Sequence, residues 1–425
     1  MKNIVILGGG FGGVQAALTL EKKLKKLRVK NDYEIILVDK EPHHTFTPLL
    51  YEAATTSKNL ADYVELKSLV SFPFAELFKD KNIRVVNDVI LHIDTAEGLV
   101  HLKQSKIRFE YLVVALGAET NYFNMFGLEE NALPLKTFMD AIRLRDAIWR
   151  RAEEGAERLR VVIGGGGSTG VELASEIKEW TRELQEEVNK SCNIDVMIIE
   201  GSKNILPGFD GRVVRKVEKR LKKIGVAIVR DEKVDKVTQK DIILESAEKI
   251  AYDILVWAGG VKAVPLTEKM PLKKEKRGRI EIMGGLECIP ESPDLKIYGK
   301  IYAVGDAACI INPKTNLPVP QVARAAITQG KIAAKNIIED IKKQNFLSKK
   351  IKQYVYKPMN YPYIVPVGGK YAVAKIGLIV ISGLLAWIFK GVVELNYFLS
   401  IMNPFKALKI WLHGLRVFIQ NDRLG

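Results

Sequence analysis

Cysteine is scarce in this sequence, and so are long apolar runs. The 425 residues include three cysteines, Cys192, Cys288 and Cys309, and no CxxC pair. This scarcity excludes a disulfide framework and a paired-thiolate metal site, and it fits a reducing compartment. We predict no metal centre. Residues 3–7 are typical of a strand that begins directly after Met1, so we expect no signal peptide.

Acidic residues are outnumbered by basic ones. Lys and Arg total 65 against 50 Asp and Glu, for a net charge of +15. Such a chain can bind nucleic acid, an anionic membrane or an anionic substrate such as a dinucleotide. The lysine-rich runs at 22–26, 216–223 and 273–277 are mixed with Glu or Leu, which is typical of solvated helix faces and argues against nucleic acid. Hydrophobic residues make up 47%, which excludes a disordered chain.

A glycine loop follows the first predicted strand. Gly8, Gly10 and Gly13 have G-x-G-x-x-G spacing between the apolar run at 4–7 and an amphipathic helix. One glycine makes the turn, one lets a pyrophosphate approach the backbone, and one lets the helix pack on the strand. A second strand then ends at Asp39, whose carboxylate can accept the ribose hydroxyls of an adenosine. The segment predicts a dinucleotide site.

The same arrangement recurs later in the chain. Gly165, Gly167 and Gly170 repeat the spacing between a strand at 160–163 and a long amphipathic helix, and the next strand ends at Glu200. Two dinucleotide folds in one chain support hydride transfer between a nicotinamide and a flavin. A carboxylate at Glu200 suits the free 2′-hydroxyl of NADH and repels a 2′-phosphate, so we expect NADH rather than NADPH.

These patterns predict an α/β fold with two Rossmann-like dinucleotide-binding domains and a C-terminal membrane-associating helical region. We place the FAD-binding domain at 1–118 and 290–345, and the NAD-binding domain at 119–289. The FAD-binding domain is discontinuous, because a strand that resembles its last one follows the NADH unit. Residues 346–425 form the C-terminal region.

The motifs resemble those of the type II NADH dehydrogenases, which are single-chain NADH:quinone oxidoreductases of the two-dinucleotide-domain flavoprotein superfamily. The resemblance covers about residues 1–345 through the segments 44–51, 111–117, 256–260 and 302–306. It implies non-covalent FAD at Gly8, Gly10, Phe11, Gly12, Gly13, Asp39, Lys40, Thr47, Pro48, Val89, Gly117 and Asp306. It implies NADH at Gly165, Gly167, Ser168, Thr169, Gly170, Glu172, Glu200, Gly259 and Gly260.

The resemblance also implies a membrane quinone as electron acceptor, without proton pumping. The stretch 320–330 lies where the family has its quinone motif, and Ala323, Ala326, Thr328 and Gln329 are the predicted contacts. Arg324 and Thr328 replace two glutamines of that motif, so the quinone species stays open. Gln329 and Glu172 are the predicted catalytic residues. Glu172 is expected near the nicotinamide, either as a proton donor for the reduced quinone or as an acid that complements the helix dipole.

The C-terminal region predicts attachment to a membrane surface. From Asn403–Pro404 a helix carries Phe, Leu and Trp on one face and cations on the other, as interfacial helices do. The uncharged run 376–389 is also helix-like, but at roughly 1.5 Å per residue it reaches only about 21 Å, too short to span a bilayer. We expect 376–420 to bind an anionic membrane on the cytoplasmic face as a peripheral, monotopic protein. A homodimer or packing role for this region stays open.

Enzymes of the same fold offer alternatives that depend on cysteine. A dithiol reductase needs CxxxxC beside the first helix, and residues 43–52 contain no cysteine. A sulfide:quinone reductase needs a redox-active cysteine pair, for which only Cys309 is a candidate. A third alternative is a non-enzymatic NADH-sensing membrane flavoprotein.

Overall fold

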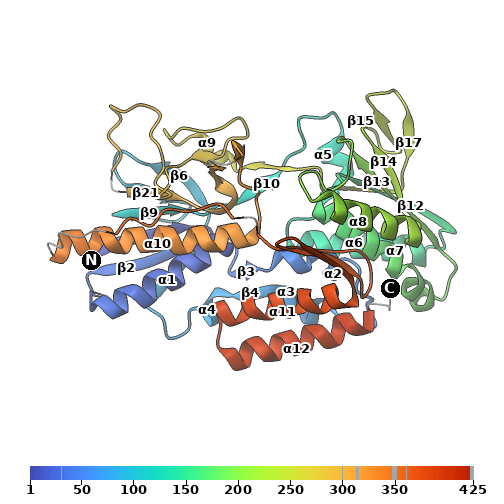
Figure 1. Cartoon of the computed structure of the whole chain (residues 1–425), viewed down its shortest axis with the longest axis horizontal. Coiled ribbons are helices and arrows are strands. Elements are labelled where there is room, and N and C mark those ends of the chain that lie inside the picture. The colour runs from blue at the N-terminus through green and yellow to red at the C-terminus, as the bar shows by residue number, and fades with distance from the viewer. Residues whose placement is uncertain (30, 299, 313–314, 347–351, 360, 422–425) are drawn as a thin grey trace. The chain divides into compact units, whose positions relative to one another are not determined.

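The structure is a computed structural model that describes residues 1–29, 31–298, 300–312, 315–346, 352–359 and 361–421 (Figure 1). The chain folds into two compact units, each assembled from three segments. The first unit consists of Met1–His44, Phe72–Glu119 and Val261–Met359. The second unit consists of Thr45–Ser71, Thr120–Gly260 and Asn360–Gly425.

The first unit is built on a five-stranded parallel sheet of order β21-β9-β1-β2-β5. These strands are β1 (Lys2–Leu7), β2 (Tyr33–Asp39), β5 (Ile83–Asn87), β9 (Tyr111–Val114) and β21 (Lys300–Ala303). The central strands are uninterrupted apolar runs because helices and loops cover both faces of a parallel sheet. Helix α1 (Phe11–Leu27) follows the first strand and packs along α10 (Ala323–Phe346).

The second unit repeats this plan. Its parallel sheet has the order β11-β18-β12-β13-β14. These strands are β11 (Ala132–Pro134), β12 (Arg158–Gly164), β13 (Asn193–Glu200), β14 (Ala227–Arg230) and β18 (Ile254–Trp257). The main helices are α6 (Phe138–Glu153), α7 (Ser168–Val188) and α8 (Gly211–Ile224).

Each unit also carries a three-stranded antiparallel sheet. It comprises β6 (Ile90–Asp94), β7 (Leu99–Leu102) and β8 (Lys106–Arg108) in the first unit, and β15 (Val234–Val237), β16 (Asp241–Leu244) and β17 (Lys249–Ala251) in the second. Two parallel sheets with matching antiparallel additions confirm the predicted α/β fold with two Rossmann-like domains.

The remaining elements are short. The helical ones are η1 (Thr47–Leu49), α2 (Leu50–Ala53), α3 (Tyr63–Val70), α4 (Phe74–Leu77), α5 (Leu128–Asn131), α9 (Pro265–Glu268) and η2 (Gly305–Ala307). The strands are β3 (His43–Thr45), β4 (Ser71–Pro73), β10 (Ala118–Thr120), β19 (Val261–Ala263), β20 (Ile280–Glu281), β22 (Ala308–Cys309), β23 (Ile311–Asn312) and β24 (Leu317–Pro318).

The two units differ from the predicted domain boundaries at three places. The chain returns to the first unit at Val261 rather than at 290, because Met270, Leu272 and Ile280 are buried in the core of that unit. Residues 45–71 belong to the second unit, where α2 and α3 pack on α6. The C-terminal region is not separate, since its sheet packs on α7 and α8 of the second unit.

The prediction of a helix-like run over 376–389 is wrong. An antiparallel sheet of β25 (Tyr363–Pro366), β26 (Ala372–Ile376) and β27 (Ile379–Gly383) occupies its first half. Helix α11 (Leu384–Ile401) begins only afterwards. Gly377 and Gly383 have φ of 60° and 89°, so the backbone turns there, and the β-branched residues between them favour a strand.

The predicted helix after Asn403 is confirmed as α12 (Pro404–Asn421), which lies beside α11 (Figure 1). Asn403 caps it by accepting a hydrogen bond of 3.0 Å from the Phe405 N–H. In the described part of the chain, α11 is the one helix long and apolar enough to cross a membrane, and 22% of it is buried. Length and composition alone do not make it a span.

Candidate functional site

The first glycine loop, between β1 and α1, leaves space for a nucleotide. Gly8 has a φ of 101°, and a Cβ there would lie 2.3 Å from the carbonyl oxygen of Ala115. A Cβ on Gly13 would lie 1.9 Å from the Gly8 carbonyl oxygen, whereas one on Gly10 would meet nothing within 4 Å. Gly8 therefore makes the turn, Gly13 permits close packing, and Gly10 leaves open space for a pyrophosphate.

The second glycine loop, between β12 and α7, has the same construction. Gly165 has a φ of 107°, and its Cβ would lie 2.6 Å from the carbonyl oxygen of Ala258. A Cβ on Gly170 would lie 1.9 Å from the Gly165 carbonyl oxygen, and one on Gly167 would meet nothing within 4 Å. Both units therefore hold a cradle in which a dinucleotide can contact the backbone.

The acid at the end of the second strand binds back to the glycine loop in both units. Asp39 Oδ2 accepts a hydrogen bond of 2.6 Å from the Gly9 N–H, and Glu200 Oε2 accepts one of 2.7 Å from the Gly166 N–H. The other oxygen of each acid accepts one N–H from the residue two positions later. Each carboxylate oxygen has further acceptor capacity, so both acids can still receive ribose hydroxyls.

Gln329 holds in place the loop at Gly305, which follows β21 and carries Asp306. It is 4% exposed, and its Oε1 accepts a hydrogen bond of 2.7 Å from the Gly305 N–H. Gly305 has a φ of 70°, and a Cβ on it would lie 3.4 Å from the Ala326 Cβ. Gln329 and Ala326 therefore face the loop that carries Asp306 and fix its backbone.

The other two predicted quinone residues have different surroundings. The Thr328 hydroxyl donates to the Arg324 carbonyl oxygen of its own helix at 2.9 Å. Ala323 is half-buried at the first residue of α10. The quinone role of Ala323, Ala326, Thr328 and Gln329 stays a prediction.

His44 packs against the first glycine loop and contacts its backbone. It is fully buried, and its Nδ1 lies 2.9 Å from the Gly9 carbonyl oxygen. Burial lowers the pKa of His44 to about 4, so the imidazole is neutral at physiological pH. The Phe11 ring packs edge-on against it, with 5.0 Å between ring centroids. His44 is therefore a positioning residue for the loop.

The remaining predicted cofactor residues lie at loops and helix starts. In the first unit, Lys40 and Val89 are exposed and Gly117 has a φ of 71°. In the second unit, Thr47 and Pro48 are exposed in η1, Ser168 and Thr169 begin α7, and Gly259 and Gly260 follow β18. Trp257 of β18 lies under the second glycine loop, because a Cβ on Gly164 would lie 2.3 Å from its ring.

Glu172 lies near a cluster of charged groups in the second unit. Burial raises the pKa of Glu172 to about 8, with a nearby Lys390 opposing the effect and Glu52 reinforcing it. Glu172 thus holds its proton at neutral pH and can donate it. The predicted catalytic role of Glu172 stays a prediction.

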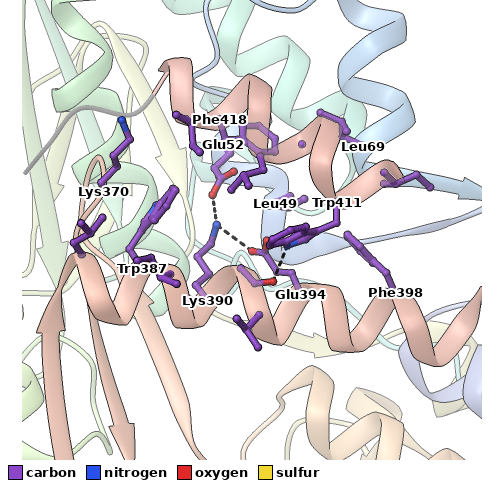
Figure 2. A pocket seen from close by; sticks show the side chains of 18 residues that line it. Leu49, Glu52, Leu69, Lys370, Trp387, Lys390, Glu394, Phe398, Trp411 and Phe418 are labelled. Carbon is purple, nitrogen blue, oxygen red and sulfur yellow. Dashed lines mark hydrogen bonds and ion pairs between the residues drawn. The ribbon is translucent and has the colours of Figure 1, made fainter. Parts of the chain in front are cut away.

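A cavity of about 450 Å³ lies between α11, α12 and the segment that contains α2 and α3 (Figure 2). Trp387, Phe398, Trp411 and Phe418 supply aromatic lining, and Leu49 and Leu69 are among its aliphatic residues. The Trp411 Nε1–H donates to the Gly391 carbonyl oxygen at 2.8 Å and joins the two helices. Glu52, Lys390 and Glu394 bring charge into this apolar lining.

The two nucleotide cradles and the paired parallel sheets define a two-dinucleotide-domain oxidoreductase. The family model of the pyridine nucleotide-disulphide oxidoreductases matches residues 2–330, and the chain belongs to this family. Its three cysteines are nevertheless free and buried. Burial raises the pKa of all three thiols, which disfavours the reactive thiolate form.

Curated relatives confirm the resemblance predicted from the sequence. The chain is 29% identical to the type II NADH:quinone oxidoreductase Ndh of Mycobacterium tuberculosis, over 96% of this chain and 87% of the relative. It is 27% identical to the type II NADH:quinone oxidoreductase of Haemophilus influenzae, over 84% and 83%.

Solved structures share the fold. NDH2 from Plasmodium falciparum in complex with NADH matches with a TM-score of 0.80 at 18% identity, over 100% of this chain and 99% of that one. The sulfide:quinone oxidoreductase of Aquifex aeolicus matches with a TM-score of 0.74 at 20% identity, over 97% and 92%.

Glu52, Lys390 and Glu394, which line the cavity, were not predicted as site residues from the sequence. Lys390 and Glu394 have i, i+4 spacing inside an otherwise apolar helix, which is a detectable signal of a functional pair. Glu52 had no such signal, because only the fold brings α2 beside α11.

Proposed function

We propose that this protein is a type II NADH:quinone oxidoreductase. It takes a hydride from NADH onto non-covalent FAD and passes two electrons to a membrane quinone, without pumping protons. The observation that carries this proposal is the pair of nucleotide cradles with the same construction, in a chain whose three cysteines are free and buried. The curated relatives that bear the name NADH:quinone oxidoreductase support it.

The first unit supplies the residues that would hold FAD. Gly8, Gly10 and Gly13 let the pyrophosphate reach the backbone, and Asp39 receives the adenosine ribose. Asp306 follows a parallel strand at the same sheet edge and offers its carboxylate to the ribityl chain. When bound, FAD supplies the two-electron carrier between nicotinamide and quinone.

The second unit binds the electron donor and selects it. Glu200 holds the glycine loop and accepts the ribose hydroxyls of NADH, while its negative charge repels the 2′-phosphate of NADPH. Glu172, protonated at neutral pH, is proposed to take part in the delivery of a proton to the reduced quinone.

The apolar cavity accommodates the acceptor. A quinone with a long chain is a flat ring on a hydrocarbon tail, and the aromatic and aliphatic lining of this cavity matches that chemistry. Its volume of about 450 Å³ is within the range of small-molecule pockets.

The exposed apolar residues of α11 and α12 attach the protein to a bilayer. Leu385 and Phe405 are 73% and 86% exposed, which is costly in water and favourable in a membrane interface. We place the protein peripherally on the cytoplasmic face, with 376–420 against anionic lipids. A homodimer is the further proposed assembly.

Steady-state NADH oxidation with and without a quinone tests the function. The proposal predicts quinone-dependent NADH oxidation, and NADH binding without turnover would indicate a sensing role instead. Quinone reduction that depends on sulfide but not on NADH would indicate a sulfide:quinone reductase.

A further inference from the structure

Lys390 lies between the carboxyl groups of Glu52 and Glu394 at the wall of the apolar cavity (Figure 2). It forms an ion pair with Glu52 of α2, and its Nζ is 3.0 Å from Oε1 of Glu394, one turn later in α11. Glu172 of α7 interacts electrostatically with Lys390 and Glu52. The single ammonium group of Lys390 thus forms ion pairs with two acids and interacts electrostatically with a third.

These groups are largely withdrawn from water. Glu52 is 3% exposed, and the side chains of Lys390 and Glu394 are 13% and 15% exposed. Buried carboxylates raise each other's pKa, since each negative charge makes the next one harder to form. Tyr51 and Glu176 also face the cluster, and Lys370 lines the same cavity.

Burial and neighbouring charges shift the pKa of two acids near Lys390 in the same direction. Burial and Glu52 raise the pKa of Glu394 above its ordinary value, although Lys390 opposes them. The pKa of Glu172 is about 8 for the same reasons. Lys390 carries one positive charge against the two carboxyl groups that contact it, so the charge balance at this wall favours a neutral Glu394.

Of these acids, Glu394 lines the cavity and belongs to α11, one of the two helices that we propose attach to the bilayer. Its surroundings there are aromatic and aliphatic, so a carbonyl oxygen of a ligand in the cavity has few donors to bind. A protonated carboxyl group can donate one hydrogen bond to that oxygen.

We propose that Glu394 is a catalytic acid that donates a hydrogen bond and then a proton to the quinone bound in this cavity. The inference rests on the proposed function. In the overall reaction, NADH, one proton and the quinone yield NAD⁺ and the quinol. The hydride of NADH carries both electrons and one proton, and Glu394 delivers the second proton. Lys390 holds the carboxyl in position and is itself held by Glu52, and the proton of Glu394 is restored from solvent by way of Glu172.

Glu394→Gln tests the proposal, because the amide keeps the size and hydrogen bonding of the side chain but has no proton to give. Glu186→Gln is the matched control, since Glu186 forms an exposed i, i+4 ion pair of 3.0 Å with Arg182. We expect Glu394→Gln to lower kcat with quinone about 100-fold, as loss of a general acid does. KM should change by less than about threefold, and Glu186→Gln should leave both values unchanged.

Ferricyanide separates proton delivery from every earlier step, because it accepts electrons without a proton. Turnover of Glu394→Gln with ferricyanide should equal that of the wild type. Infrared difference spectra on binding of a quinone analogue should show a protonated carboxyl signal that Glu394→Gln lacks. If Glu394→Gln does not fold, Glu394→Asp can be used, because it shortens the side chain by one methylene and keeps the acid. Its kcat with quinone should fall about tenfold, and its kcat with ferricyanide should not change.

Three results would overturn the proposal: quinone turnover of Glu394→Gln equal to the wild type, an equal loss with ferricyanide, or an unchanged carboxyl signal. Failure of the proposed function is distinguishable, since the wild type itself would then oxidise NADH with ferricyanide but not with quinone.

Discussion

Membrane binding through α12 is the prediction that the structure makes most quantitative. Phe405 and Leu412 lie on one face of this helix, seven residues apart, and are 86% and 50% exposed. Transfer of a whole Phe or Leu side chain out of water contributes about 1.5–3 kcal/mol, so these exposed fractions make the pair worth about 3 kcal/mol. At 1.4 kcal/mol per tenfold, Phe405→Ser with Leu412→Ser should weaken binding to vesicles about 100-fold.

Co-sedimentation with anionic vesicles measures this affinity. The control is Phe126→Ser with Leu317→Ser, because these residues are 77% and 63% exposed and lie outside α11 and α12. It should bind like the wild type, and high salt should weaken both proteins only partly, since screening does not act on apolar burial. An affinity within threefold of the wild type for the α12 variant would refute the reasoning, as would an equal loss in the control.

Further predictions concern the two nucleotide cradles and the residues around them. Acid precipitation should release all the flavin as FAD, identified by chromatography of the supernatant. Glu200→Arg should narrow the preference for NADH, measured as the ratio of kcat/KM for NADH and NADPH. Glu172→Gln should slow quinone turnover more than flavin reduction in single-turnover mixing, and wild-type turnover should fall above about pH 8, where Glu172 loses its proton. Gln329→Leu leaves the Gly305 N–H unpaired, which costs about 1–3 kcal/mol, so FAD occupancy by absorbance should fall.

Local pattern was sufficient for the nucleotide cradles. Each needs a turn glycine, an open glycine and a packing glycine at set spacing, and the positive φ of Gly8 and Gly165 is a requirement that few other residues meet. Asp39 and Glu200 were found because they end the next strand of the same short unit. The start of α12 at Asn403–Pro404 was found for the same reason, since capping depends on neighbours in the chain.

Local pattern failed where two structures compete for one apolar segment. Residues 376–389 are uncharged and were predicted to be helix-like, but apolarity alone does not separate a hairpin from a helix. The turn at Gly377 and the pairing of β27 with β26 and of β26 with β25 decided between them, and strand pairing is not visible in the composition of one segment.

The sequence by itself determined the two dinucleotide folds, the acids that end their second strands and the amphipathic last helix, because each rests on residues close together in the chain. Tertiary structure alone decided how Glu52 meets Lys390 and Glu394, how Gln329 reaches Gly305, and where the apolar cavity lies. These contacts join segments that are far apart in sequence, and the pKa of a buried acid depends on which charges folding brings beside it.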